Sequence, residues 1–286
     1  MQQFLWVTAP AKINLTLNVL GKRSDGYHEL ETVMHKVNLS DRLRFQPASG
    51  IKVSGNDDSL DWGSSNLVYK AALLILNRYS PHLGVDIYVE KNIPTGAGLA
   101  GGSTDAAAAL TGINNLYTLN VSPENMFEMA KSLGSDVPFC LPSGPSTALA
   151  KGRGEILTPL PLGEPLALVI IKPDFSLSTS EIYRRFNSDN ASRHADTGAF
   201  INAVKSGSLK DMACAMENEL EAVSVLDYPI IASIKRHLES TGALKALMTG
   251  SGPCVFGLFA DTASAGKAYA ILAETYNTIF AVSSYF

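Results

Sequence analysis

The segment Pro94-Thr95-Gly96-Ala97-Gly98-Leu99-Ala100-Gly101-Gly102-Ser103-Thr104-Asp105, followed by four alanines, decides the fold class of this 286-residue chain. Before it, Val85–Glu90 alternates apolar and polar residues, as a half-buried strand does. The implied order is strand, glycine-rich loop, helix. Glycines let backbone amides approach an anion closely, and the N–H groups at a helix start favour phosphate. The segment therefore predicts a phosphate-binding loop.

Two other glycine motifs and a turn without a ligand are the alternatives. Gly96, Gly98 and Gly101 fit the dinucleotide pattern GxGxxG, which requires an acidic residue at the end of a second strand about 20 residues later. Residues 114–125 instead are polar and lead into a helix cap. The ATP-binding pattern GxxxxGK[ST] also comes close, but Gly102 stands where its lysine belongs. A turn without a ligand would cost backbone entropy with no compensating contact.

Composition and charge favour a globular chain and argue against nucleic acid and anionic membranes as partners. The chain is 46% hydrophobic and has a formal net charge of −4, so no positive field attracts nucleic acid or an anionic membrane. We find no secretory signal and no apolar run long enough to span a bilayer, and we expect a cytoplasmic protein. The three cysteines are widely spaced among apolar neighbours, which predicts reduced core residues rather than a disulfide or zinc site.

The spacing of apolar residues and the positions of glycine and proline indicate two domains. We expect a strand over Ile13–Val19, directly after Lys12, and helices over 66–79 and 123–133, the second ended by Gly134. The proline-rich run 158–165 precedes an apolar strand over 166–171. We therefore place a boundary near residue 160 and expect domains over 1–160 and 161–286.

The chain resembles the GHMP kinases, whose signature loop is similar to Pro94 through Ala106 and whose C-terminal glycine turn is similar to 247–256. Three further blocks narrow the resemblance to the branch that acts on a cytidine diphosphate-linked methylerythritol. They are Ala9–Leu15 with Arg23–Leu30, Leu133–Phe139 and Gly152–Glu155. The resemblance covers essentially the whole chain and is most specific in the first 155 residues and the glycine turn.

The resemblance implies a two-domain α+β fold and an ATP-dependent kinase. An N-terminal mixed α/β domain would bind the nucleotide, a C-terminal domain would be ferredoxin-like, and the active site would lie between them. The reaction implied is phosphorylation of the substrate 2-hydroxyl in the non-mevalonate isoprenoid pathway, by a monomer or homodimer. The alternatives are a homoserine or mevalonate kinase, and a non-catalytic nucleotide sensor. Lys12 and Asp136 argue against the sensor, because binding alone needs neither.

The family also implies a role for each matching residue. Asp136 would be the catalytic base, supported by Lys12, although Lys12 alone has the pattern of a surface lysine whose stem packs on Ala11 and Ile13. Magnesium would accompany ATP, with Ser103 as its protein contact. No sequence pattern of a structural metal site occurs. ATP would be bound by Pro94, Thr95, Gly96, Ala97, Gly98, Leu99, Ala100, Gly101, Gly102, Ser103 and Thr104.

The substrate would be held at three places. Tyr27 would stack on the cytosine, His28 would make hydrogen bonds to it, and Tyr183 would close its other face. Asn14, on the strand face of Lys12, would contact the erythritol hydroxyls. Lys151 is the expected contact of the diphosphate, with Arg153 left open as the alternative.

Overall fold

The structure is a computed structural model that describes residues 4–186 and 194–286. The chain forms two compact units. Of the described residues, the first unit contains 4–11, 39–93 and 100–144, and the second contains 12–38, 94–99, 145–186 and 194–286. Two long strands, β1 (Leu5–Lys22) and β2 (His28–Ala48), therefore contribute residues to both units. The single boundary near residue 160 stays a prediction.

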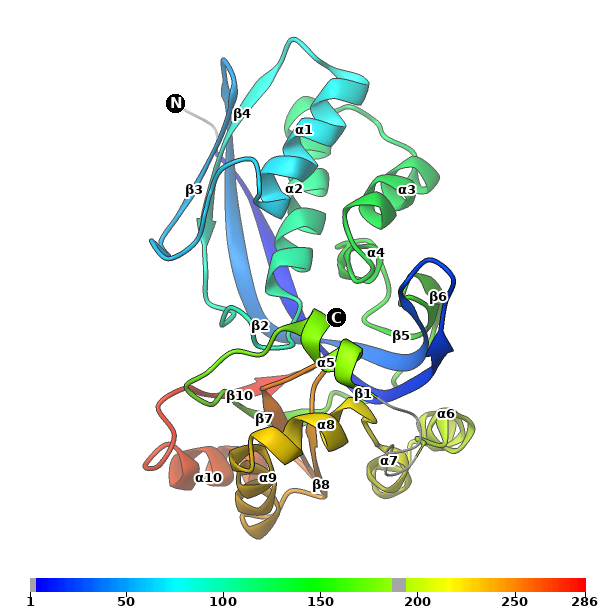
Figure 1. Ribbon diagram of the computed structural model, residues 1–286. Helices are drawn as coiled ribbons and strands as arrows, with labels where there is room; N and C mark the ends of the chain where they lie inside the picture. The colour runs from blue at the N-terminus through cyan, green and yellow to red at the C-terminus, as the bar shows by residue number, and fades with distance from the viewer. Residues whose placement is uncertain (1–3, 187–193) are drawn as a thin grey trace. The chain divides into compact units, whose positions relative to one another are not determined.

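The first unit packs helices on a sheet (Figure 1). Its strands follow the order β3 (Ile51–Gly55), β4 (Gly84–Glu90) and the second half of β2, with β3 parallel and β2 antiparallel to β4. Helices α1 (Leu67–Tyr79), α2 (Gly101–Tyr117) and α3 (Pro123–Leu133) lie on one face, and the short α4 (Val137–Cys140) follows α3. Gly112 of α2 allows close packing, since a Cβ there would lie 2.3 Å from the ring of Phe45.

In the second unit, the first half of β2 pairs with β5 (Thr147–Gly152), which pairs with β6 (Ile156–Pro159). A separate antiparallel sheet has the order β10-β7-β9-β8. Its strands are β7 (Ala167–Ile171), β8 (Lys245–Met248), β9 (Val255–Phe259) and β10 (Ile279–Ser283). All five residues of β7 and of β9 are buried, as expected of the two central strands.

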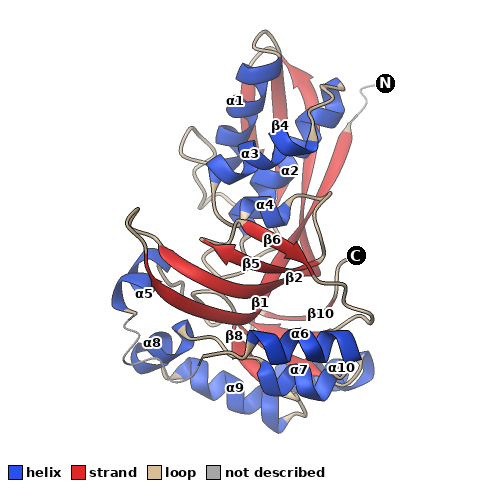
Figure 2. Cartoon of the chain, turned by 90° about the vertical axis from the view of Figure 1, so that its right-hand side faces the viewer, coloured by secondary structure: helices blue, strands red, loops and turns tan. Residues whose placement is uncertain are grey.

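Six helices complete the second unit as the structure describes it: α5 (Thr179–Arg185), α6 (Thr197–Ser206), α7 (Leu209–Ala215), α8 (Leu220–Asp227), α9 (Ile230–Ser240) and α10 (Thr262–Leu272). Figure 2 shows α9 and α10 against the β10-β7-β9-β8 sheet. Ile231, Ile234 and Leu238 of α9 pack on Val169 and Phe259 in one apolar core. Helices after the first and third strands and this strand order make the arrangement ferredoxin-like, so the α+β fold class is confirmed.

Most of the predicted elements are confirmed. The helices over 66–79 and 123–133 are α1 and α3, whose N-caps Asn66 and Ser122 accept N–H groups of the first turn. The prediction that Lys12 precedes its strand is wrong, because β1 begins at Leu5. Cys140 and Cys254 are buried, but Cys214 on α7 is exposed and is no core residue. The predicted glycine loop is also shorter than expected, since α2 begins at Gly101.

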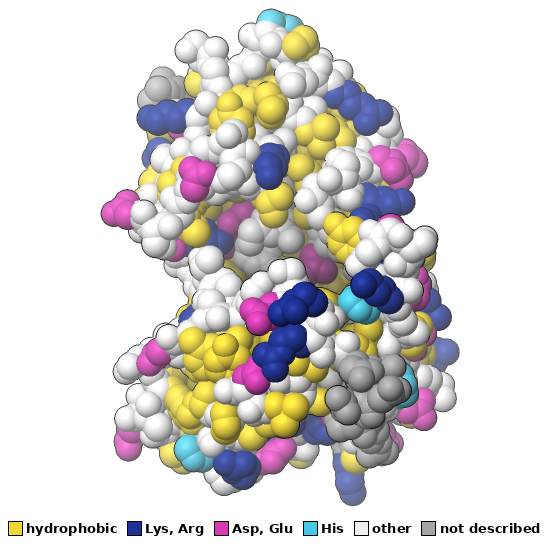
Figure 3. Space-filling view, in the orientation of Figure 1, with side chains coloured by type: hydrophobic (Ala, Val, Ile, Leu, Met, Phe, Trp, Pro, Cys, Tyr) yellow, Lys and Arg dark blue, Asp and Glu magenta, His cyan; other side chains and the backbone are white. Residues whose placement is uncertain are grey.

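The surface mixes side chains of both signs. On the face shown in Figure 3, lysine and arginine side chains alternate with acidic and apolar ones. Within residues 4–186 and 194–286, no helix has the length and apolarity needed to cross a membrane.

Candidate active site

Lys12 and Asn14 point to the same side of β1 and are both buried. Lys12 Nζ donates a hydrogen bond to Asn14 Oδ1 at 2.7 Å, as expected for residues two apart on a strand. Only 5% of Lys12 and 3% of Asn14 is exposed. A lysine is rarely buried without a partner, because the ammonium loses its hydration. Lys12 is therefore no plain surface lysine, and its burial supports the functional role that the family implies.

The C-terminal glycine turn lies directly against Asn14 and the first half of the glycine-rich segment. The Thr249 hydroxyl accepts the backbone N–H of Asn14 at 3.0 Å and donates to the Gly98 carbonyl at 3.5 Å. The N–H of Cys254 reaches the Ala97 carbonyl at 3.4 Å. Three motifs that are far apart in the sequence thus meet within the second unit.

Gly98 must be glycine for this packing as well as for any ligand. Its φ is +77°, and a Cβ there would lie 2.4 Å from the Thr249 carbonyl oxygen. Asn218 holds the other side of the turn, because its Nδ2 donates to the carbonyls of Met248 and Gly250 at 2.7 and 2.9 Å. Asn218 was missed from the sequence, since no local pattern links it to a turn about 30 residues later.

The start of α2 has the form of an anion site. Its N-cap, Ala100, is left-handed with φ 59°, and no side chain caps the helix. Non-glycine residues adopt this conformation at a cost of about 1–3 kcal/mol, typically at functional sites. The N–H groups of the first turn, which includes Gly101, Gly102 and Ser103, can therefore meet phosphate oxygens, helped by the helix dipole. Thr104 turns inward instead, and its hydroxyl donates to the Pro10 carbonyl at 2.8 Å.

Three buried ionisable residues in the first unit join the two ends of the glycine-rich segment, and they too were missed. Lys91 forms ion pairs with Asp105 of α2 at 2.7 Å and with Asp41 of β2. Asp41 Oδ1 also accepts the N–H groups of Asn92 and Ile93. Burial raises the pKa of Asp105 to about 8; Lys91 opposes this rise and Asp41 adds to it. This triad fixes where the segment begins and where α2 starts.

Asp136 is the N-cap residue that directly precedes α4 in the first unit. It is half-buried, and its carboxylate does not cap the turn. Pro138 lies at the start of α4, where its fixed φ suits a helix. The start of α4 therefore fixes the backbone position of Asp136, which carries the carboxylate. Its role as a base stays a prediction.

Aromatic side chains gather where cytosine binding is predicted. The rings of His28 and Tyr183 stack with centroids 5.3 Å apart and planes at 29°. Tyr27 is 53% exposed, and the Arg153 guanidinium lies 4.9 Å from its ring centroid. Burial, and then the charge of Lys22, lowers the pKa of His28, which favours the neutral imidazole. Flat aromatic faces that are partly open suit a nucleobase.

The two candidates for the diphosphate contact differ in their surroundings. Lys151 is engaged in a cross-strand ion pair with Glu31 at 2.9 Å. Arg153 stacks on Tyr27 and has a longer contact, 3.6 Å, with Glu155. Arg153 is thus the basic residue that joins the aromatic group.

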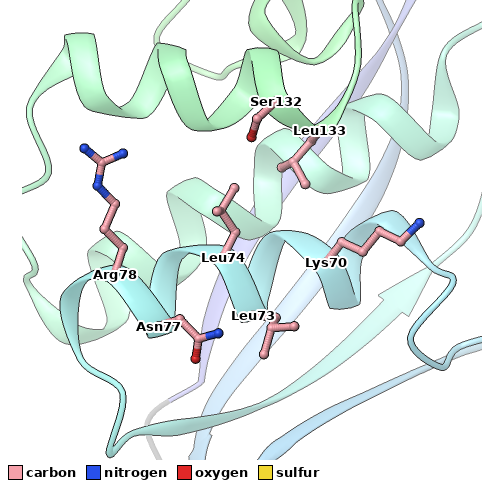
Figure 4. Close-up of a pocket in the computed structure, with 7 residues that line it drawn as sticks. All are labelled: Lys70, Leu73, Leu74, Asn77, Arg78, Ser132 and Leu133. Carbon is pink, nitrogen blue, oxygen red and sulfur yellow. The ribbon is translucent and has the colours of Figure 1, made fainter.

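A separate groove of about 520 Å³ runs between α1 and α3. Figure 4 shows its lining, which contains none of the predicted site residues: Lys70, Leu73, Leu74, Asn77, Arg78, Ser132 and Leu133. Among the described residues, no group of three or more His, Cys, Asp or Glu side chains is arranged to hold a metal ion.

Comparison with known proteins agrees with this architecture. The chain matches the GHMP kinases N terminal domain over residues 66–144 and the GHMP kinases C terminal domain over residues 200–278. It is 50% identical over 286 residues to a protein of Syntrophomonas wolfei named 4-diphosphocytidyl-2-C-methyl-D-erythritol kinase, covering 100% of both chains. A protein of the same name from Pelotomaculum thermopropionicum is 50% identical over 259 residues, 90% of each chain.

Solved structures point the same way. A crystal structure of 4-(cytidine 5'-diphospho)-2C-methyl-D-erythritol kinase matches with a TM-score of 0.84 and 33% identity, covering 99% of this chain and 100% of that one. A homoserine kinase from Cytophaga hutchinsonii shares the fold, with a TM-score of 0.79 and 20% identity over 100% of this chain and 95% of that one. The chain therefore belongs to the GHMP kinase family.

Proposed function

We propose that this chain is an ATP-dependent kinase that phosphorylates the 2-hydroxyl of 4-diphosphocytidyl-2-C-methyl-D-erythritol. The observation that carries the proposal is full-length identity of 50% to a relative of that name. The group formed by Tyr27, His28, Tyr183 and Arg153 adds support, because a homoserine or mevalonate acceptor has no base to stack on these rings.

The bond changes follow from the chemistry of phosphoryl transfer. The acceptor oxygen attacks the γ-phosphorus in line, the bond to the β,γ-bridging oxygen breaks, and ADP leaves. The hydroxyl proton passes to the Asp136 carboxylate, while the Lys12 ammonium stabilises negative charge at the reacting oxygens. Because the transition state is loose, positioning and charge matter more than full deprotonation.

ATP would be held by the glycine-rich segment, with its phosphates at the N–H groups that begin α2. The Ser103 hydroxyl would be the protein contact of magnesium, which would supply neutralisation of the phosphate charge. We also propose that Arg153 contacts the diphosphate and that the enzyme works in the cytoplasm.

The test is an acceptor panel with magnesium-ATP and the purified chain. The cytidine-linked methylerythritol should give ADP and a new phosphomonoester in phosphorus NMR, whereas homoserine and mevalonate should give neither. Phosphorylation of homoserine or mevalonate instead would reassign the substrate. ATP binding without transfer to any of the three would support the non-catalytic sensor.

A further inference from the structure

A line of buried hydrogen bonds begins at Lys12 and lies wholly within the second unit. Lys12 Nζ donates to Asn14 Oδ1 at 2.7 Å, Asn14 Nδ2 donates to Thr32 Oγ1 at 2.8 Å, and Thr32 Oγ1 donates to the Thr16 carbonyl at 2.5 Å. At most 5% of any of these four residues is exposed. Water therefore cannot replace a missing partner cheaply, and each bond constrains the next.

The last acceptor of this line, the Thr16 carbonyl, determines which group donates and which accepts in each of its hydrogen bonds. A carbonyl oxygen only accepts, so the single Thr32 hydroxyl proton must go to Thr16. Thr32 must then accept from Asn14, which places the amide nitrogen of Asn14 toward Thr32 and its oxygen toward Lys12. A reversed amide would set an NH₂ group against the Lys12 ammonium, two donors facing each other. The hydroxyl of Thr32 thus selects one orientation of the Asn14 amide.

The backbone of Asn14 is fixed as well, because its N–H donates to Thr249 Oγ1 at 3.0 Å. With main chain and amide both held, Oδ1 is a stationary acceptor for the flexible lysine stem. The second lone pair of Oδ1 and the second hydrogen of Nδ2 are not used by the line, so a substrate contact by Asn14 remains compatible with it.

We propose that Thr32 and Asn14 are positioning residues that aim the Lys12 ammonium at the reacting oxygens. The inference rests on the proposed role of Lys12 in phosphoryl transfer. Thr32 itself touches neither nucleotide nor acceptor in this account. Its removal should therefore lower kcat and leave the KM of both substrates nearly unchanged.

Three variants test this. Thr32→Val keeps the side-chain shape but removes the hydroxyl, and kcat should fall roughly 10- to 100-fold, as for a misplaced catalytic group. Thr32→Ser keeps the hydroxyl and should stay within about twofold of wild type. Thr147→Val is the matched control, because Thr147 is a 1%-exposed threonine whose hydroxyl bonds only His35 among the printed contacts of the described residues. It should lose stability without losing kcat.

Equal kcat losses in Thr32→Val and Thr147→Val would overturn the proposal, as would a loss in Thr32→Val that appears only in KM. A second measurement needs neither a variant nor activity. In the wild-type protein, the Asn14 Nδ2 protons should exchange with solvent far more slowly than those of an exposed asparagine such as Asn120. Equally fast exchange would also overturn the proposal. If the wild type proves inactive on the cytidine-linked acceptor, the proposed function fails, while this measurement still tests whether the Asn14 amide is held within the buried line.

Discussion

Replacing Gly98 with alanine should weaken both the fold and ATP binding, because two different constraints meet at this residue. Its φ of +77° strains any residue with a Cβ. The added Cβ would also lie 2.4 Å from the Thr249 carbonyl oxygen and 3.0 Å from that of Gly252. Both neighbours are backbone atoms and cannot rotate away. The glycine turn and the glycine-rich segment would have to separate.

Gly207 provides a matched control for the first constraint alone. It is the C-cap of α6, its φ is +69°, and a Cβ there would have no heavy atom within 4 Å. Left-handed backbone costs an L-residue about 1–2 kcal/mol, so both alanine variants should lose that amount. Overpacking should add about 1–3 kcal/mol at Gly98 only.

The assay is denaturant unfolding of both variants together with calorimetric titration of ATP. We expect Gly98→Ala to lose about 2–5 kcal/mol of unfolding free energy and Gly207→Ala about 1–2 kcal/mol. ATP binding should weaken about tenfold in Gly98→Ala. Without ATP the glycine-rich segment of the variant can shift and relieve its strain, and about 1.4 kcal/mol of that strain must be restored when the segment adopts its ATP-bound conformation. Gly207→Ala should bind ATP as the wild type does. Equal stability losses would refute the packing argument, and unchanged ATP affinity in Gly98→Ala would remove this segment from the nucleotide site.

Three further predictions follow from buried or stacked groups. Lys91→Met should lower the free energy of unfolding by about 3–5 kcal/mol, because it leaves the Asp41 and Asp105 carboxyls buried without a cation. Denaturant unfolding measures this, and a loss below about 1 kcal/mol would contradict the prediction. Burial lowers the pKa of His35 from 6.5 to about 4. Between pH 6.5 and about 4, His35 is therefore protonated in the unfolded state and neutral in the folded state. The free energy of unfolding should fall by about 3 kcal/mol as the pH drops through this range. His35→Gln should lack that dependence, and identical pH profiles would argue against the assignment. Tyr27→Ala should weaken binding of the cytidine-linked substrate by about 1–3 kcal/mol and leave ATP affinity unchanged, and an equal loss for both ligands in calorimetry would remove Tyr27 from the cytosine site.

Local sequence patterns predicted those helices and strands whose ends are marked by capping residues, glycine or proline. Helices α1 and α3 lie where they were predicted, capped by Asn66 and Ser122, and the strand after the proline-rich run is β7. The start of β1 was misjudged because the alternation of Ile13–Val19 does not continue through Ala9, Pro10 and Ala11, which are all part of the strand. Pro10 adds to the error, since proline in a strand is uncommon.

The polar networks could not be read from the sequence because their members are far apart along the chain. Asn14 meets Thr249 across 235 positions, and Lys91 meets Asp41 across 50. Each of these residues looks ordinary in its own segment, and only the tertiary fold brings donors and acceptors together. The family resemblance supplied Lys12 and Asp136 directly, but it could not show that Asn14 is bonded to Lys12 and Thr32. These hydrogen bonds are important because their partners are buried, and burial cannot be read from the residue types alone.

The most direct test of the account is the turnover of Asp136→Asn with magnesium-ATP and the cytidine-linked methylerythritol. The variant removes a charge and a proton acceptor at nearly constant volume, so both substrates should still bind. Turnover should fall by roughly 10²–10⁴, the range for loss of a general base, and combining it with Lys12→Met should add little if the two residues act as a unit. Turnover of Asp136→Asn equal to that of the wild type would contradict the account.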